Sequence, residues 1–116
     1  MSWYVLVEAN VSYSGDSTWE LVDKIPVDGG RETALARAEE ISRTYVRWAV
    51  DPEKYGRLVF QTSPTSWLVE QTWLVRYDRS DSPSTLSQLL RICVAELVFA
   101  RDPAPADPPR KGWLRR

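Results

Sequence analysis

Histidine is absent from this 116-residue chain, cysteine occurs once and lysine three times. Without histidine, neither a Ser-His nor a Cys-His catalytic pair can form, and zinc loses its commonest protein ligand. The single cysteine, Cys93, excludes an intrachain disulfide and a cysteine-based metal site. Its neighbours Ile92, Val94 and Ala95 are apolar, which favours a small buried side chain over a reactive thiol. We therefore expect no catalytic residues, no metal, no cofactor and no enzymatic activity.

Long hydrophobic runs are also missing. No stretch approaches the roughly 18–20 consecutive apolar residues that span a bilayer. The first residues lack the basic start and the long apolar run of a secretory signal. A lone cysteine suits a reducing compartment. We therefore expect a cytoplasmic protein without a membrane span.

The remaining candidates for chemistry are carboxylates and glycines. Glu39 and Glu40 are adjacent on a predicted helix, so they diverge by about 100° and cannot form a catalytic pair. Glu70 lies in a predicted strand and would suit acid or base chemistry only if it were desolvated. Pairing with a cross-strand arginine, or contact with water, is the simpler interpretation. Gly29 and Gly30 precede a helix, but they lack the spacing of a phosphate-binding loop.

The net charge of −1 is unevenly distributed along the chain. Residues 108–116 hold four basic side chains and no acidic one, so residues 1–107 hold 11 basic and 16 acidic side chains, a balance of −5. Affinity for nucleic acid comes mainly from cations on phosphates, and an acidic body repels phosphate. We therefore do not expect nucleic acid as a partner.

Apolar alternation in the first part of the chain predicts an antiparallel hairpin. Residues 2–11 and 18–25 have the period of strands, and the polar residues 12–17 between them have the composition of a turn. In the second strand the pattern places Trp19, Leu21 and Ile25 on one face and Val22 on the other, and Pro26 is expected to end it.

A helix is predicted over residues 31–49, before Asp51 and Pro52. Its apolar residues recur at three- and four-residue spacing: Ala34, Ala38, Ile41, Tyr45 and Trp48. Two further strands are predicted over residues 55–62 and 66–77. In the second of these the alternation places Trp67, Val69, Gln71, Trp73, Val75 and Tyr77 on one face, and Leu68, Glu70, Thr72, Leu74 and Arg76 on the other.

Residues 86–101 fit both a helix and a strand, because a short apolar run does not distinguish the two by period. We favour the strand, since the long strand 66–77 needs a partner after a loop of hairpin size. From Asp102 onward, four prolines in 103–109 favour an extended polyproline conformation.

The fold class is therefore α+β. We expect a single small domain over 1–101 with a mainly antiparallel sheet, followed by a Pro-rich basic tail over 102–116. The order along the chain is two strands, one main helix on one face of the sheet, and three further elements, of which the last is either a strand or a helix.

The function is predicted from a shortage of cover for the sheet. Five strands span roughly 24 Å, whereas one helix covers about 10 Å, so several hundred Å² of apolar surface stays open. Six tryptophans add aromatic side chains of the kind that is enriched at interfaces. We expect a non-enzymatic protein-interaction module that self-associates or docks on a larger assembly through an aromatic sheet face. The predicted contact residues are Trp67, Trp73, Tyr77, Trp3, Trp19 and, in the tail, Trp113, Arg115 and Arg116.

Two other functions remain open. The small size and acidic body also suit an immunity or antitoxin-like inhibitor of a basic effector. A dimeric α+β barrel that binds a small ligand in an aromatic cavity is the other alternative.

Overall fold

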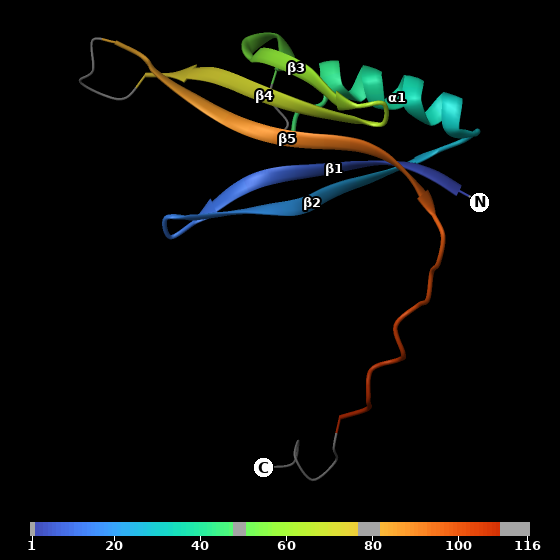
Figure 1. Ribbon diagram of the computed structural model, residues 1–116. Coiled ribbons are helices and arrows are strands. Elements are labelled where there is room, and N and C mark those ends of the chain that lie inside the picture. Colours follow the sequence, from blue (N-terminus) through green and yellow to red (C-terminus); the bar gives the residue numbers. More distant parts are fainter. Residues whose placement is uncertain (1, 48–50, 77–81, 110–116) are drawn as a thin grey trace, which may run out of the picture.

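The computed structural model describes residues 2–47, 51–76 and 82–109 of the chain. The elements are β1 (Ser2–Tyr13), β2 (Asp16–Val27), α1 (Arg31–Thr44), the short 3-10 turn η1 (Pro52–Lys54), β3 (Gly56–Ser63), β4 (Ser66–Val75) and β5 (Ser84–Leu97). The five strands form one antiparallel sheet in the order β2-β1-β5-β4-β3, and α1 lies on one face of it (Figure 1). The α+β class and the order of elements along the chain are confirmed, and the ambiguous segment is a strand.

The β1–β2 hairpin closes through a two-residue turn. Ser14 and Gly15 both have positive φ, at 50° and 90°. Positive φ at both central positions defines a type I′ turn, whose twist matches that of the two strands. The turn is therefore confined to the middle of the polar segment, and both strands extend further than predicted.

A β-bulge divides β2 into two parts. Val7 pairs with Asp23 whereas Glu8 pairs with Leu21, so Val22 is an extra residue on β2. Because of this extra residue, Leu21 and Ile25 point to opposite faces, and Val22 packs with Ile25 against the core. The prediction that Leu21 and Ile25 share a face is wrong, because strict alternation does not allow for a bulge.

Pro26 does not end β2, which continues to Val27. The residue pairs with Tyr4 of β1, the neighbour of this edge strand in the described sheet. A proline is tolerated at a sheet edge because the missing N–H on the outer side has no strand to bond.

Helix α1 ends at Thr44, five residues earlier than predicted, and Tyr45 has an extended backbone with φ −65° and ψ 131°. The Arg57 side chain donates hydrogen bonds to the carbonyls of Ser42 (3.2 Å) and Tyr45 (2.6 Å), and Gln71 also donates to Tyr45 (3.2 Å). These donors replace the next turn of helix. Trp48, which the helical pattern included, lies outside the described residues.

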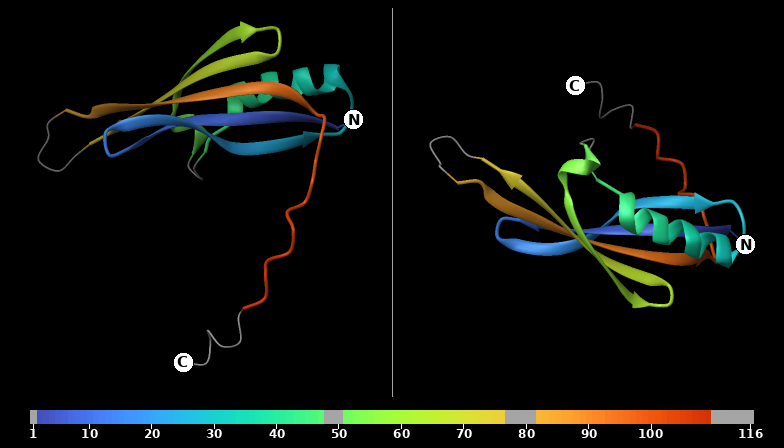
Figure 2. Two further views of the ribbon diagram at one scale, coloured as in Figure 1. Left: turned by 60° about the horizontal axis from the view of Figure 1, so that its bottom comes forward. Right: turned by 90° about the horizontal axis from the view of Figure 1, so that it is seen from above.

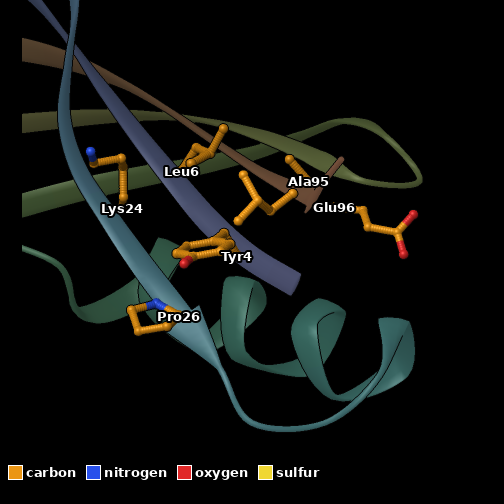
Figure 3. Close-up of a pocket in the computed structure, with 7 residues that line it drawn as sticks. Tyr4, Leu6, Lys24, Pro26, Ala95 and Glu96 are labelled. Atoms are coloured by element: carbon orange, nitrogen blue, oxygen red, sulfur yellow. The ribbon is translucent and has the colours of Figure 1, made fainter. Parts of the chain in front are cut away.

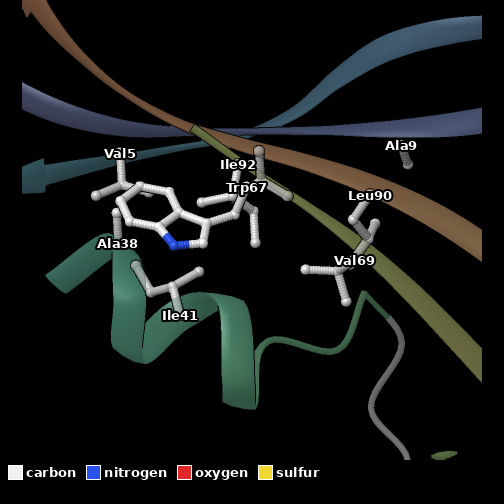
Figure 4. Close-up of a cluster of buried hydrophobic side chains, with 9 residues drawn as sticks. Val5, Ala9, Ala38, Ile41, Trp67, Val69, Leu90 and Ile92 are labelled. Carbon is white, nitrogen blue, oxygen red and sulfur yellow. The ribbon is translucent and has the colours of Figure 1, made fainter. Parts of the chain in front are cut away.

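The core lies between α1 and the sheet. Helix α1 contributes mainly small residues, and Ala38 and Ile41 pack against Trp67, which is 7% exposed (Figure 4). The small side chains of the helix let the large indole fit beneath it. The remaining residues of this cluster come from three strands: Val5, Val7, Ala9, Val69, Leu90 and Ile92.

Strand β5 ends at Leu97, four residues before the predicted boundary. Residues 98–109 form neither helix nor strand, and all of them are exposed. They leave the sheet on the side opposite α1 and run away from it (Figures 1 and 2).

Candidate interaction surface

Within residues 2–47, 51–76 and 82–109, no second layer covers the face of the sheet opposite α1. We call it the open face. Cross-strand register places these side chains on it: Tyr4, Leu6, Glu8, Asn10, Trp19, Leu21, Lys24, Pro26, Leu58, Phe60, Ser66, Leu68, Glu70, Thr72, Leu74, Thr85, Ser87, Leu89, Arg91, Cys93, Ala95 and Leu97. Figure 2 shows that α1 lies entirely on the other side. More than half of these side chains are apolar, so the open face differs from the polar outer face of an ordinary antiparallel sheet.

The large apolar side chains of the open face are strongly exposed. Those with the greatest exposed fractions are Leu21 (52%), Leu58 (55%), Phe60 (52%), Leu74 (68%) and Leu97 (41%). They come from four of the five strands, including both edge strands β2 and β3. Exposed apolar side chains are therefore distributed over the whole face and are not confined to one strand.

One ion pair lies near the middle of the open face. Arg91 Nε lies 3.4 Å from Glu8 Oε1, and these two residues are direct cross-strand neighbours on β5 and β1. The Arg91 guanidinium also lies over the Trp19 ring, 3.9 Å from its centroid. One side of this tryptophan is therefore covered by its own chain through a cation–π contact.

Two further charges flank this pair. Lys24 pairs by register with Leu6, and Glu70 lies between Leu58 and Leu89. Within the described part of the chain neither charge takes part in an ion pair, so of the two expectations for Glu70, an arginine pair or contact with water, the arginine pair is not seen. Lys24 is exposed, and Glu70 is half-buried.

A groove lies at the end of the open face from which residues 98–109 emerge. It is lined by Tyr4, Leu6, Lys24, Pro26, Ala95, Glu96 and Leu97 (Figure 3). Apolar atoms predominate in this lining, since only Lys24 and Glu96 are charged. Nearby on the same face, burial and the Glu8 carboxylate raise the pKa of the Cys93 thiol above its ordinary value, while Arg91 opposes the shift. A raised pKa keeps this thiol protonated at neutral pH, as expected for an unreactive cysteine.

The tryptophans predicted as contacts do not form one patch. Trp3, Trp67 and Trp73 share the face that α1 covers, whereas Trp19 lies on the open face. Trp67 is a core residue, and half-buried Trp73 stacks on Tyr55 with ring centroids 5.2 Å apart. Tyr77, Trp113, Arg115 and Arg116 lie outside the described residues.

Sequence reasoning did not single out Leu58 and Phe60. In β3 these two alternate with Arg57, Val59 and Gln61, which face α1. The more apolar set of this strand is the exposed one, because Arg57 is needed at the end of the helix. Its alternation therefore carries no signal that Leu58 and Phe60 are exposed.

Three observations bear on other kinds of site. In the ranges 2–47, 51–76 and 82–109, no group of three or more metal-ligating side chains is positioned to hold an ion. No described helix combines the length and the apolar character that crossing a membrane requires. Comparison with protein families, with curated proteins and with solved structures finds no significant match for this chain.

Proposed function

We propose that this protein is a non-enzymatic protein-interaction module that self-associates through its open face. The observation that carries the proposal is the uncovered apolar surface opposite α1, with Leu58, Phe60 and Leu74 each more than half exposed. Exposed apolar surface of this extent is typical of an interaction site, because it leaves water in contact with side chains that a partner would bury.

The size of the open face fits a dimer interface. Five strands about 4.8 Å apart and some ten residues long at about 3.3 Å each give an area of about 800 Å². A standard protein interface buries roughly this area on each partner. A second sheet packed at about 10 Å would therefore cover the face in a single layer.

The charges of the open face favour a second copy of this chain as the occupant. Lys24 and Glu70 lie on opposite sides of the Glu8–Arg91 pair, on β2 and β4. In a two-fold symmetric interface the same surface meets itself. When the axis passes over the Glu8–Arg91 pair, Lys24 of each copy meets Glu70 of the other, so each unpaired charge gains a partner.

Phe60→Asp tests the role of the open face. We expect the wild-type chain to be dimeric at micromolar concentration and the variant to be monomeric, because the interface would have to bury an uncompensated carboxylate. Light scattering coupled to size exclusion, across a dilution series, measures the mass.

Ala36→Asp is the matched control, because Ala36 is exposed on α1 on the opposite side of the sheet. It introduces the same charge and should leave the dimer intact. A wild-type chain that stays at 13.3 kDa at every concentration would contradict the proposal. Equal loss of the dimer in both variants would also count against it.

A further inference from the structure

We propose that residues 98–109 form an arm that packs into the groove at the end of the open face of a second copy. The inference rests on the proposed self-association and adds a named segment of one chain as the occupant of a named groove in the other. It depends on three features of the described residues: the apolar start of the arm, its direction and its reach.

The arm begins with two large apolar side chains that its own domain does not cover. Val98 is 73% exposed and Phe99 67%, directly after the last residue of β5. The one ring contact described for Phe99 is with Arg101, whose guanidinium lies 5.4 Å from the ring centroid and belongs to the arm itself. Burial of Val98 and Phe99 therefore requires a surface outside their own domain.

The direction of the arm leads to the space that the second copy would occupy. Residues 98–109 leave the sheet on the side of the open face, away from α1 (Figures 1 and 2). Packed sheets lie about 10 Å apart, and an extended chain advances about 3.3 Å per residue. Phe99 is the second residue beyond Leu97, so it reaches the side chains of a facing sheet, and the following residues of the arm then lie along that sheet.

The groove matches the composition of the arm. Tyr4, Leu6 and Pro26 offer an aromatic ring and apolar surface, with Lys24 and Glu96 at the rim (Figure 3). Pro103, Pro105, Pro108 and Pro109 favour a preformed polyproline conformation. Such segments bind aromatic-lined grooves at low entropic cost, because little of their conformational freedom is lost on binding. The groove adjoins the exit point of the arm, and in a two-fold dimer the two arms are exchanged, so that each arm enters the groove of the other copy.

Phe99→Asp in the full chain tests the contribution of the arm to the affinity. We expect the dissociation constant of the dimer to rise by at least about tenfold, as for the loss of a buried aromatic anchor. Ala36→Asp places the same charge on α1, on the opposite side of the sheet, and should change the constant by less than about threefold. Far-ultraviolet circular dichroism checks that the folded domain is unchanged in both variants.

Cross-linking between two single-cysteine chains tests the location. In a Cys93→Ser background, one chain carries Ala100→Cys in the arm and a differently tagged chain carries Pro26→Cys in the groove. A short bismaleimide should join the two tags. Replacing Pro26→Cys by Ala36→Cys, on the far side of the sheet, should abolish the product.

The outcomes separate the two proposals. A monomeric wild-type chain overturns both. If the wild-type chain is a dimer and Phe99→Asp does not weaken it, the proposal for the arm is wrong, whereas the proposal of an open-face dimer still holds. A dimer that cross-links no better through Pro26→Cys than through Ala36→Cys also overturns the arm, because its location is then wrong.

Discussion

At the C-terminal end of α1, the Arg57 side chain donates the hydrogen bonds that a further turn of helix would otherwise supply. Its guanidinium bonds the carbonyls of Ser42 and Tyr45, two of the acceptors that a helix end leaves without an intrahelical donor. A cation is also favoured there by the negative end of the helix dipole. Partial burial lowers the pKa of Arg57 below its ordinary value, yet an arginine stays charged under any physiological condition. One side chain thus joins β3 to the C-terminal end of α1.

Arg57→Met should lower the free energy of unfolding by about 2 kcal/mol, because it removes hydrogen bonds from a charged donor and leaves their acceptors partly buried. Urea unfolding followed by tryptophan fluorescence measures the change. Arg43→Met is the control: Arg43 forms an exposed pair with Glu39 on the same helix, and its loss should cost less than about 0.5 kcal/mol. Equal losses would show that Arg57 is no more than another surface charge.

The β1–β2 hairpin shows how local backbone geometry determines an element. Ser14 and Gly15 both adopt positive φ, and a Cβ built on Gly15 has no heavy atom within 4 Å. Substitution at this position is therefore free of steric contact with the rest of the chain. Any loss of stability on substitution must therefore come from the backbone conformation of residue 15.

Gly15→Ala should destabilise the protein by about 1–2 kcal/mol, the cost of holding an L-residue in the left-handed region. Thermal or urea unfolding measures it. Gly30→Ser is the matched control, because Gly30 caps α1 with a negative φ of −96° and its added Cβ also meets nothing within 4 Å. Its effect should stay within a few tenths of a kcal/mol and be favourable, since serine is a good N-cap. A Gly15→Ala chain as stable as the wild type would refute the type I′ interpretation.

At the scale of the whole molecule, Lys24 and Glu70 would define one relative orientation of the two copies in the proposed dimer. Lys24 at one side and Glu70 at the other allow a symmetric pairing that no single chain can make, because β1 and β5 separate the two strands that carry them. Charge complementarity of this kind selects register and partner more than it adds affinity. Exchanging the charges of Lys24 and Glu70 should therefore leave the affinity of the dimer close to that of the wild type.

Lys24→Glu and Glu70→Lys should each weaken the dimer about tenfold, because each places like charges opposite one another. The double variant, with both charges exchanged, should return to within about threefold of the wild-type dissociation constant. Sedimentation equilibrium on the three variants and the wild type measures the constants. If the two single effects simply add in the double variant, the two residues do not meet and the orientation is wrong, although the open-face dimer itself would stand.

Local pattern was enough to predict most of the elements of this protein. Alternation in 2–11 and 66–77 identified β1 and β4, and the three- to four-residue spacing from Ala34 to Ile41 identified α1, because both signals depend on short-range geometry. The same alternation correctly placed Trp67 and Trp73 on one face of β4. The absence of histidine and the single cysteine were equally plain in the sequence.

Tertiary structure decided which face of the sheet is covered. Alternation separates Trp67 from Leu68 but does not indicate where a helix packs. Sequence alone therefore predicts Trp67 as a contact residue, whereas in the structure it belongs to the core. The bulge at Val22, the early end of α1 and the exposure of Phe60 all depend on partners distant in sequence. Composition and period thus determined the elements and the excess of apolar surface, whereas packing of one small-residue helix on the Trp67 face decided where that excess lies.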